Sequence, residues 1–153
     1  MTTVAIISQK GGAGKTTLAL HLAVAAQDAG RVSLIIDTDP QATASQWGSW
    51  REDKPPEVID SPPPRLAAKV EQAQEQGAQF VVIDTPPHAD SAARAAVETA
   101  DLVLIPCRPS AFDLAAIQTT VKLVQLLRKP AFVVFTAGSP NAPRMYEEAD
   151  ELV

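Results

Sequence analysis

A run of glycines enclosed by two lysines has the residue types and the spacing that binding of a phosphate chain requires. Glycines let successive backbone N–H groups turn toward one anion and let the backbone approach it closely. Behind them, Lys15 would reach the β- and γ-phosphates of a nucleotide, and the Thr16 hydroxyl would bind Mg²⁺. We therefore expect nucleotide contacts along the whole run, which consists of Lys10, Gly11, Gly12, Ala13, Gly14, Lys15, Thr16 and Thr17.

This run departs from the common G-x-x-x-x-G-K-[ST] phosphate-loop pattern at its first position, where Gln9 stands instead of glycine. The sequence has K-G-G-x-G-K-T, with Lys10 ahead of the glycines. From average residue usage, a chance match in a chain of this length has a frequency on the order of one in ten thousand. That frequency disfavours the alternative, which is a glycine-rich turn that only caps a helix.

Three aspartates follow two apolar runs that have the character of strands. Asp84 ends the run Phe80–Ile83, and Asp37 ends a second run, with Asp39 two residues further on. Ligands of open α/β sheets bind at the carboxyl edge of the strands, where a carboxylate can hold Mg²⁺ through a coordinated water. Carboxylates that converge on a phosphate loop repel one another unless a cation is present. We therefore predict a Mg²⁺ site formed by Thr16, Asp37 and Asp84, although a lone aspartate after a strand is more often a helix cap or turn former.

The elements that must position these groups alternate along the chain. Short apolar runs separate longer segments of helical period, which is typical of β-α-β units and of a parallel sheet covered on both faces. The predicted strands are Val4–Ser8, Val32–Asp37, Phe80–Asp84, Leu102–Cys107 and Ala131–Phe135, with an edge strand at Glu57–Ile59. The predicted helices are Lys15–Ala29, Gln41–Trp50, Arg65–Gln76, Ser91–Ala100 and Asp113–Leu127. The expected fold class is α/β, a three-layer α-β-α arrangement with a mainly parallel sheet of the P-loop nucleoside-triphosphatase type, in a single domain over residues 1–153.

Length and composition are those of an ordinary globular domain. The 153 residues are 46% hydrophobic and 20% charged, and the net charge is −5 with no strongly basic segment. This charge argues against a surface that attracts nucleic acid everywhere. The apolar run Val4–Ile7 is too short for a signal peptide or a membrane span, so we expect a cytoplasmic protein. The one cysteine, Cys107, excludes an intrachain disulfide and a multi-cysteine metal site, and we interpret it as a packing residue.

Two segments stand outside the alternating pattern. Five prolines make Lys54–Pro64 a stiff, extended connection, which we interpret as a plain linker rather than a polyproline site for a partner. A last helix is predicted to begin near Pro143, and a sheet of this type usually places another strand after such a helix. We therefore expect that the chain is cut at Val153 and that the natural protein continues.

Four stretches together resemble the deviant-Walker-A ATPases, and most of all the ParA-type partition ATPases. They keep the order and spacing of that family across nearly the whole chain. The stretches are Lys10–Thr17, Asp37-Thr38-Asp39-Pro40-Gln41, Asp84-Thr85-Pro86-Pro87, and Leu104-Ile105-Pro106 followed by Pro109 and Asp113.

The resemblance implies a Mg²⁺-dependent ATPase that binds ATP and ADP and closes two subunits face to face. In that dimer Lys10, the signature lysine, would cross the interface to the partner's nucleotide and act as an arginine finger does. Asp39 is implied to position the attacking water, and Asp84 to sense the γ-phosphate together with the turn that follows it. The implied catalytic residues are Lys10, Lys15 and Asp39.

The same resemblance implies partners and a role. It implies a stimulating centromere- or cargo-binding protein, and non-specific DNA contacted by a region beyond Val153, with association to the nucleoid and no membrane. The expected role is partitioning of plasmids or chromosomes, or positioning of another cargo. The strand end Phe135–Gly138 lacks the Asn or Arg often found near the adenine base, so no residue yet accounts for a preference for ATP over GTP.

Other functions fit the sequence less well. A MinD-like membrane-cycling ATPase needs a C-terminal amphipathic helix, and none is evident before Val153. A relative of the nitrogenase iron protein needs more cysteines than Cys107 to hold an iron–sulfur cluster. A nucleotide-binding regulatory scaffold without useful turnover is disfavoured by the presence of both Lys10 and Asp39.

The two histidines and the two tryptophans are interpreted mainly as structural. His21 has apolar neighbours in the predicted first helix and is expected to pack in the core. His88 follows the expected switch and is interpreted as a loop residue, with contact to water or phosphate as the alternative. Trp47 and Trp50 are three residues apart on one helix face, and we expect core or interface packing rather than base stacking.

Overall fold

Six parallel strands form the centre of the part of the molecule that the computed structural model describes, which is residues 1–52, 54–138, 146 and 149. The strand order in the sheet is β3-β2-β4-β1-β5-β6, and every neighbouring pair is parallel. The strands are β1 (Thr2–Ile6), β2 (Ser33–Asp37), β3 (Glu57–Asp60), β4 (Phe80–Asp84), β5 (Leu102–Cys107) and β6 (Ala131–Phe135). The parallel sheet predicted from the sequence is therefore confirmed.

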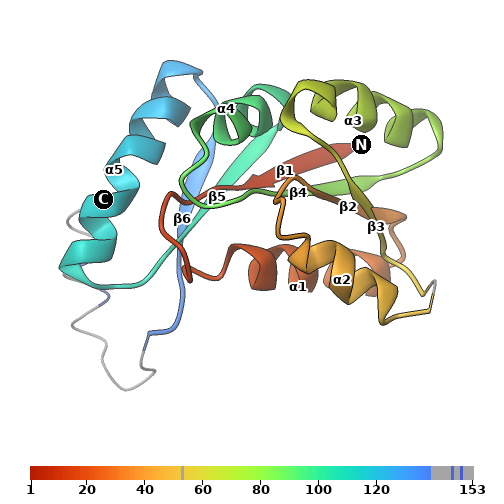
Figure 1. Ribbon diagram of the computed structural model, residues 1–153, viewed down its shortest axis with the longest axis horizontal. Helices are drawn as coiled ribbons and strands as arrows, with labels where there is room; N and C mark the ends of the chain where they lie inside the picture. Colours follow the sequence, from red (N-terminus) through yellow and green to blue (C-terminus); the bar gives the residue numbers. More distant parts are fainter. Residues whose placement is uncertain (53, 139–145, 147–148, 150–153) are drawn as a thin grey trace.

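Helices cover both faces of this sheet, which gives the three layers that the sequence predicts (Figure 1). Helices α1 (Lys15–Asp28) and α2 (Thr43–Ser49) lie on one face. Helices α3 (Leu66–Glu75), α4 (Asp90–Thr99) and α5 (Ala111–Leu126) lie on the other, and a 3₁₀ turn, η1 (Pro63–Arg65), precedes α3. Two separate clusters of buried apolar side chains fill the spaces between the layers.

The strand register brings three strand ends to one edge of the sheet. Ile6 of β1 and Asp37 of β2 both pair with Asp84 of β4, which lies between them. Side chains in the following turns fasten these ends together, because the Thr38 hydroxyl donates to the Asp84 carbonyl at 2.7 Å and the Thr85 hydroxyl donates to the Ile6 carbonyl at 2.8 Å. The two predicted carboxylates of the metal site therefore lie on adjacent strands at the edge from which the phosphate loop also departs.

Most predicted elements are present, with shifted ends that have local causes. Helix α2 begins at Thr43 rather than near Gln41, because Ala42 adopts a left-handed φ of 52° that a helix cannot include. Helix α5 begins at Ala111, two residues before its predicted start, because the Ser110 side chain accepts a hydrogen bond from the Asp113 N–H and caps the first turn. The helix predicted near Pro143 lies outside the described residues except for positions 146 and 149.

The two tryptophans of α2 differ in their environment. Trp47 packs against the core cluster below the sheet, and the Arg51 guanidinium lies 4.7 Å from the centre of its ring. Trp50 is 70% exposed, so core packing applies to Trp47 alone. Among the described residues, the helices are too short or too polar to cross a membrane.

Candidate nucleotide-binding site

The phosphate loop connects β1 to α1 and has the backbone conformation that its glycines predict. Gly12 and Gly14 have φ values of 71° and 91°, in the left-handed region that favours glycine. Helix α1 starts directly behind them at Lys15, and no side chain caps its first turn. The first N–H groups of a helix have no partner within the helix, and together with the helix dipole they favour an anion. The loop is therefore shaped to accept phosphate.

Lys15 is held beneath this loop with its ammonium group among carboxylates. The residue is 7% exposed, and its Nζ donates to the Lys10 carbonyl at 3.2 Å. Burial lowers the pKa of Lys15, whereas the charges of Asp84 and Asp39 act in the opposite direction. A phosphate chain in the loop would raise the pKa of Lys15 again, because an anion close to an ammonium group stabilises its protonated state.

Asp84 is the buried carboxylate that most clearly needs a counter-ion. It is 1% exposed, and neither of its oxygens has a hydrogen-bond partner in the structure. Burial, together with the charges of Asp37 and Asp39, raises the pKa of Asp84 to about 7. The nearby Thr16 hydroxyl and Lys15 ammonium lower the pKa, although the hydroxyl is not in hydrogen-bonding geometry. Buried polar atoms without partners are rare in folded proteins, so this pair of oxygens fits the Mg²⁺ ion that the sequence predicts.

Asp37 has a different environment, although it lies on the neighbouring strand. Its carboxylate accepts the N–H of Asp39 at 3.0 Å, and both the N–H and the hydroxyl of Ser45 at 2.9 and 3.1 Å. The two bonds from Ser45 cap the first turn of α2. A helix cap is the alternative role that the sequence leaves open for an aspartate after a strand. The structure thus assigns Asp37 a capping role, and its part in the metal site stays a prediction.

Asp39 lies in the turn after β2 with one carboxylate oxygen accepting the Gln41 N–H at 2.8 Å. The residue is half-buried, and its charge acts on both Lys15 and Asp84. It therefore belongs to the same electrostatic cluster, but it is more open to solvent than Asp84 is. That position is compatible with a group that orients water at the outer phosphate.

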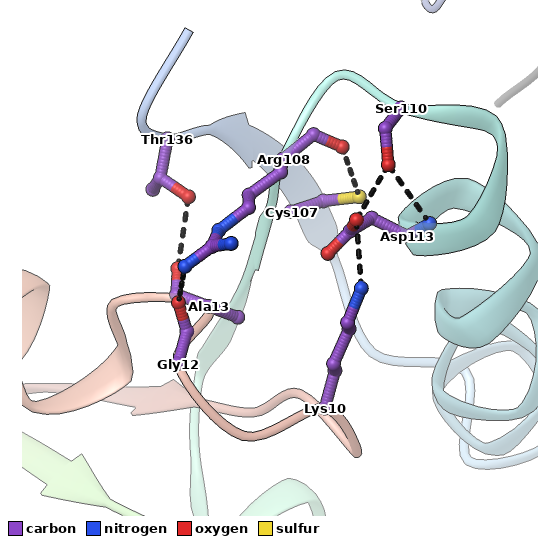
Figure 2. Close-up of polar contacts among 8 residues, drawn as sticks. All are labelled: Lys10, Gly12, Ala13, Cys107, Arg108, Ser110, Asp113 and Thr136. Atoms are coloured by element: carbon purple, nitrogen blue, oxygen red, sulfur yellow. Dashed lines mark hydrogen bonds and ion pairs between the residues drawn. The ribbon is translucent and has the colours of Figure 1, made fainter.

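Lys10, the second lysine of the loop, forms an ion pair within its own chain. Its Nζ lies 2.8 Å from the carboxylate of Asp113 on α5, and Figure 2 shows this contact beside the hydrogen bond between Ser110 and the same carboxylate. Burial alone would raise the pKa of Asp113, but Lys10 and Ser110 outweigh it and lower the pKa below its usual range. The sequence alone gives Asp113 no such role, because 103 positions separate it from Lys10.

Two further side chains hold the outer side of the loop (Figure 2). The Arg108 guanidinium donates to the Gly12 carbonyl at 2.8 Å, and the Thr136 hydroxyl donates to the Ala13 carbonyl at 2.8 Å. Arg108 follows β5 and Thr136 follows β6, so both lie at the edge where ligands of such sheets bind. The aspartates are identified because they lie at the carboxyl ends of strands. The same criterion, applied to β5 and β6, could have identified Arg108 and Thr136.

Replacement of Thr136 by valine should weaken nucleotide binding without affecting folding. The variant keeps the shape of the side chain but loses the hydrogen bond to Ala13, so the loop is less well ordered before the nucleotide binds. We expect ADP affinity to fall by about 3- to 10-fold, the equivalent of one hydrogen bond, as measured by isothermal titration calorimetry. Thr99→Val is the matched control, because Thr99 donates to a backbone carbonyl at the same 2.8 Å on α4, away from the site. Equal affinities for wild type and Thr136→Val would contradict the role given to this bond.

A cavity of about 380 Å³ opens beside the loop. Its lining combines loop residues with α1 and the end of β6, namely Gly12, Ala13, Gly14, Thr17, Leu18, His21, Thr136 and Ala137. The prediction that His21 packs in the core is wrong, because the residue is exposed. The buried positions of α1 include Ala19 and Ala23. His21 is two positions from each of them and therefore lies on the opposite side of the helix.

The interpretations of His88 and Cys107 agree with the structure. His88 lies in the loop after β4, where its backbone N–H donates to the Gln9 carbonyl at 3.3 Å. Cys107 is buried at the end of β5, and burial raises the pKa of its thiol to about 11. Its side chain belongs to one of the two core clusters, so the interpretation of Cys107 as a packing residue is confirmed.

Curated proteins with similar sequences include carboxysome distribution proteins and ParA proteins. The chain is 41% identical over 120 residues to a maintenance of carboxysome distribution protein A from Gloeobacter kilaueensis, over 77% of this chain and 54% of that protein. It is 33% identical over 150 residues to Protein ParA from Rhizobium radiobacter, over 92% of this chain and 66% of that protein. The chain thus spans between about half and two thirds of the length of these relatives.

Solved structures share the fold at lower sequence identity. MinD from Aquifex aeolicus, a cell division protein, superimposes with a TM-score of 0.81 at 17% identity, over 99% of this chain and 78% of that chain. An ATP complex of a Cyanothece McdA variant superimposes with a TM-score of 0.78 at 19% identity, over 100% of this chain and 79% of that chain. Both confirm the fold class predicted from the sequence.

A family profile covers nearly the entire chain. Residues 4–153 match the family described as the CobQ/CobB/MinD/ParA nucleotide binding domain. The match includes the phosphate loop, the aspartates that end β2 and β4, and Asp113 in the first turn of α5. The chain therefore belongs to the CobQ/CobB/MinD/ParA nucleotide-binding family.

Proposed function

We propose that this chain is the nucleotide-binding domain of an ATP-dependent switch that dimerises on ATP and separates after hydrolysis to ADP and phosphate. The observation that carries the proposal is the buried Asp84 carboxylate without a hydrogen-bond partner, which lies on the strand beside the phosphate loop and within electrostatic reach of Lys15. A buried anion, a buried cation and a phosphate-binding loop form a complete site only when Mg²⁺ and a nucleotide are bound. We take residues 1–153 as one such domain.

In this proposal each residue of the site has one task. The loop from Lys10 to Thr17 binds the phosphates, and Lys15 neutralises the β- and γ-phosphates. Thr16 and Asp84 hold Mg²⁺, with Asp37 as a further ligand if its capping bonds are released. When bound, Mg²⁺ supplies positive charge to the phosphate oxygens. Phosphoryl transfer needs positioning and electrostatic stabilisation rather than a covalent nucleophile, which agrees with the residue types present.

Lys10 has the role that makes hydrolysis depend on the dimer. In a single chain Lys10 is paired with Asp113, but its side chain remains 39% exposed. We propose that in the ATP dimer Lys10 leaves Asp113 and contacts the nucleotide of the second subunit. A cation delivered in trans stabilises charge that develops during phosphoryl transfer.

The cargo is proposed from the relatives. Their names refer to carboxysome distribution, to ParA and to chromosome partitioning, and we propose positioning of a plasmid, a chromosome or a protein-based body for this chain. A cargo-binding protein would stimulate hydrolysis, and DNA would bind the full-length protein without sequence preference. Measurement of ATP hydrolysis with and without DNA and with Mg²⁺ omitted tests this role. Nucleotide binding without any turnover would favour a regulatory scaffold.

Asp39→Ala separates a hydrolysing switch from a scaffold. The variant should bind ATP and form the dimer, because Asp39 is not buried against the metal site as Asp84 is. It should hydrolyse ATP about 10²-fold more slowly, which is typical for loss of one group that orients or stabilises the reacting atoms. Phosphate release and light scattering in the full-length protein measure the two properties.

The control for this variant is Asp28→Ala, which removes an exposed carboxylate at the end of α1, away from the loop. It should hydrolyse ATP at the wild-type rate. If Asp39→Ala loses ATP binding, the residue is a metal ligand or a structural group. If it turns over as fast as wild type, its proposed catalytic role is wrong.

A further inference from the structure

We propose that His21 reads the base of the bound nucleotide and selects adenine over guanine. This inference rests on the proposed function and adds to it a specificity-determining residue that the motifs do not provide. Its starting point is the cavity beside the phosphate loop, which His21 lines together with Leu18 of the same helix and Thr136 and Ala137 at the end of β6.

The carboxylates and the cavity lie on different sides of the phosphate loop, and this arrangement determines the orientation of the nucleotide. Asp39 and Asp84 are the groups expected at the γ-phosphate, and neither of them lines the cavity. The cavity begins instead at Gly12–Gly14 and continues to Thr17 and His21 along the outer side of α1. A nucleotide with its terminal phosphate among the carboxylates must therefore place its nucleoside on the cavity side.

The cavity has the size and the surface that a purine base requires. Its volume of about 380 Å³ falls in the usual range for small-ligand pockets, roughly 300–1,000 Å³. Leu18 and Ala137 offer apolar surface to the flat ring. The Thr136 hydroxyl already donates its hydrogen to the Ala13 carbonyl. The imidazole of His21 is therefore the polar side chain that we expect to face the base.

The hydrogen bond of His21 fixes which ring nitrogen is available. Its Nδ1 lies 2.7 Å from the carbonyl oxygen of Thr17. A carbonyl oxygen only accepts hydrogen bonds, so Nδ1 must carry the proton, and in the neutral ring Nε2 is then an acceptor. Adenine presents an amino group at its C6 position, whereas guanine presents an oxygen there. The acceptor therefore pairs with adenine and opposes the oxygen of guanine.

Diphosphates that differ only along the C6–N1 edge of the purine test the inference without hydrolysis or dimerisation. ADP and inosine diphosphate have the same sugar and phosphates, but inosine diphosphate has an oxygen at C6 and a hydrogen on N1. In isothermal titration of the full-length protein, we expect wild type to prefer ADP by about 3- to 10-fold, as one hydrogen bond permits. His21→Ala should bring the two affinities to the same value. His21→Gln, which keeps an acceptor, should retain part of the preference.

Control measurements distinguish a contact of His21 with the base from a contact with another part of the nucleotide. His88→Asn removes the other imidazole, which does not line the cavity, and should leave the ratio of the two affinities unchanged. The inference is overturned if His21→Ala keeps the wild-type ratio. It is also overturned if the variant instead loses discrimination between ADP and 2′-deoxy-ADP, because His21 would then contact the ribose. If wild type binds no nucleotide at all, the proposed function fails, and this inference fails with it.

Discussion

Lys15→Ala should abolish measurable binding of both ATP and ADP. The ammonium group is buried beneath the loop and is the cation expected to face the β- and γ-phosphates. Removal of one partner from a desolvated charge pair costs about 2–5 kcal/mol, which corresponds to a loss of affinity of roughly 30- to 4,000-fold. Isothermal titration with ADP in the presence of Mg²⁺ measures the effect.

A matched variant separates this effect from a general loss of positive charge. Lys122→Ala removes an exposed lysine in the second half of α5, and it should bind ADP as wild type does. Circular dichroism must show that Lys15→Ala is folded, because Asp84 and Asp39 lose a nearby cation in that variant. Wild-type affinity in a folded Lys15→Ala protein would mean that this loop is not the phosphate site.

Lys10→Ala should leave ADP affinity intact but abolish ATP-dependent dimerisation and hydrolysis. The side chain points to Asp113 rather than into the loop, so a single subunit does not need it to hold a diphosphate. Its proposed contact comes from the second subunit, and arginine-finger groups of this kind contribute about 10³- to 10⁵-fold to the rate. Light scattering with a non-hydrolysable ATP analogue and phosphate release measure the two losses.

Asp113→Asn distinguishes the contact within the chain from the contact between chains. This variant removes the ion pair but keeps Lys10 itself, so it should dimerise at least as readily as wild type, because less must be broken to free the lysine. Dimerisation by Asp113→Asn but not by Lys10→Ala would support the role in trans. If both variants fail to dimerise, Lys10 acts through its own chain, and the role in trans is wrong.

The sequence predicts much of the sheet and part of the site, because both depend on short-range patterns. Apolar runs such as Phe80–Ile83 have the length of buried strands, and parallel pairing places their carboxyl ends at one edge. The amino-acid sequence alone is therefore enough to place Asp37 and Asp84 together. Strand β1 starts two residues earlier than its apolar run predicts, because Thr2 and Thr3 pair with β4 although they are polar.

The remaining features depend on tertiary contacts that no local pattern records. The partner of Lys10 is brought to it by the packing of α5, and nothing in the loop itself indicates Asp113. The environment of His21 escapes prediction for a different reason, because Leu18, Leu20 and Leu22 surround it and α1 has apolar residues on nearly every side. Without a clear polar face, helical periodicity does not indicate which side is turned to the sheet.

The cap that Asp37 forms on α2 connects the proposed metal site to the part of the chain that includes the tryptophans, whose fluorescence can be measured. Helix α2 contains Trp47, and Trp50 directly follows its last residue; these are the two tryptophans of the chain. A turn of the Asp37 carboxylate toward a cation would release the Ser45 N–H and loosen the first turn of this helix. The Arg51 guanidinium, 4.7 Å from the Trp47 ring, would then shift against the indole. We therefore expect binding of Mg²⁺ and nucleotide to change the intrinsic fluorescence of the protein, which needs no attached dye.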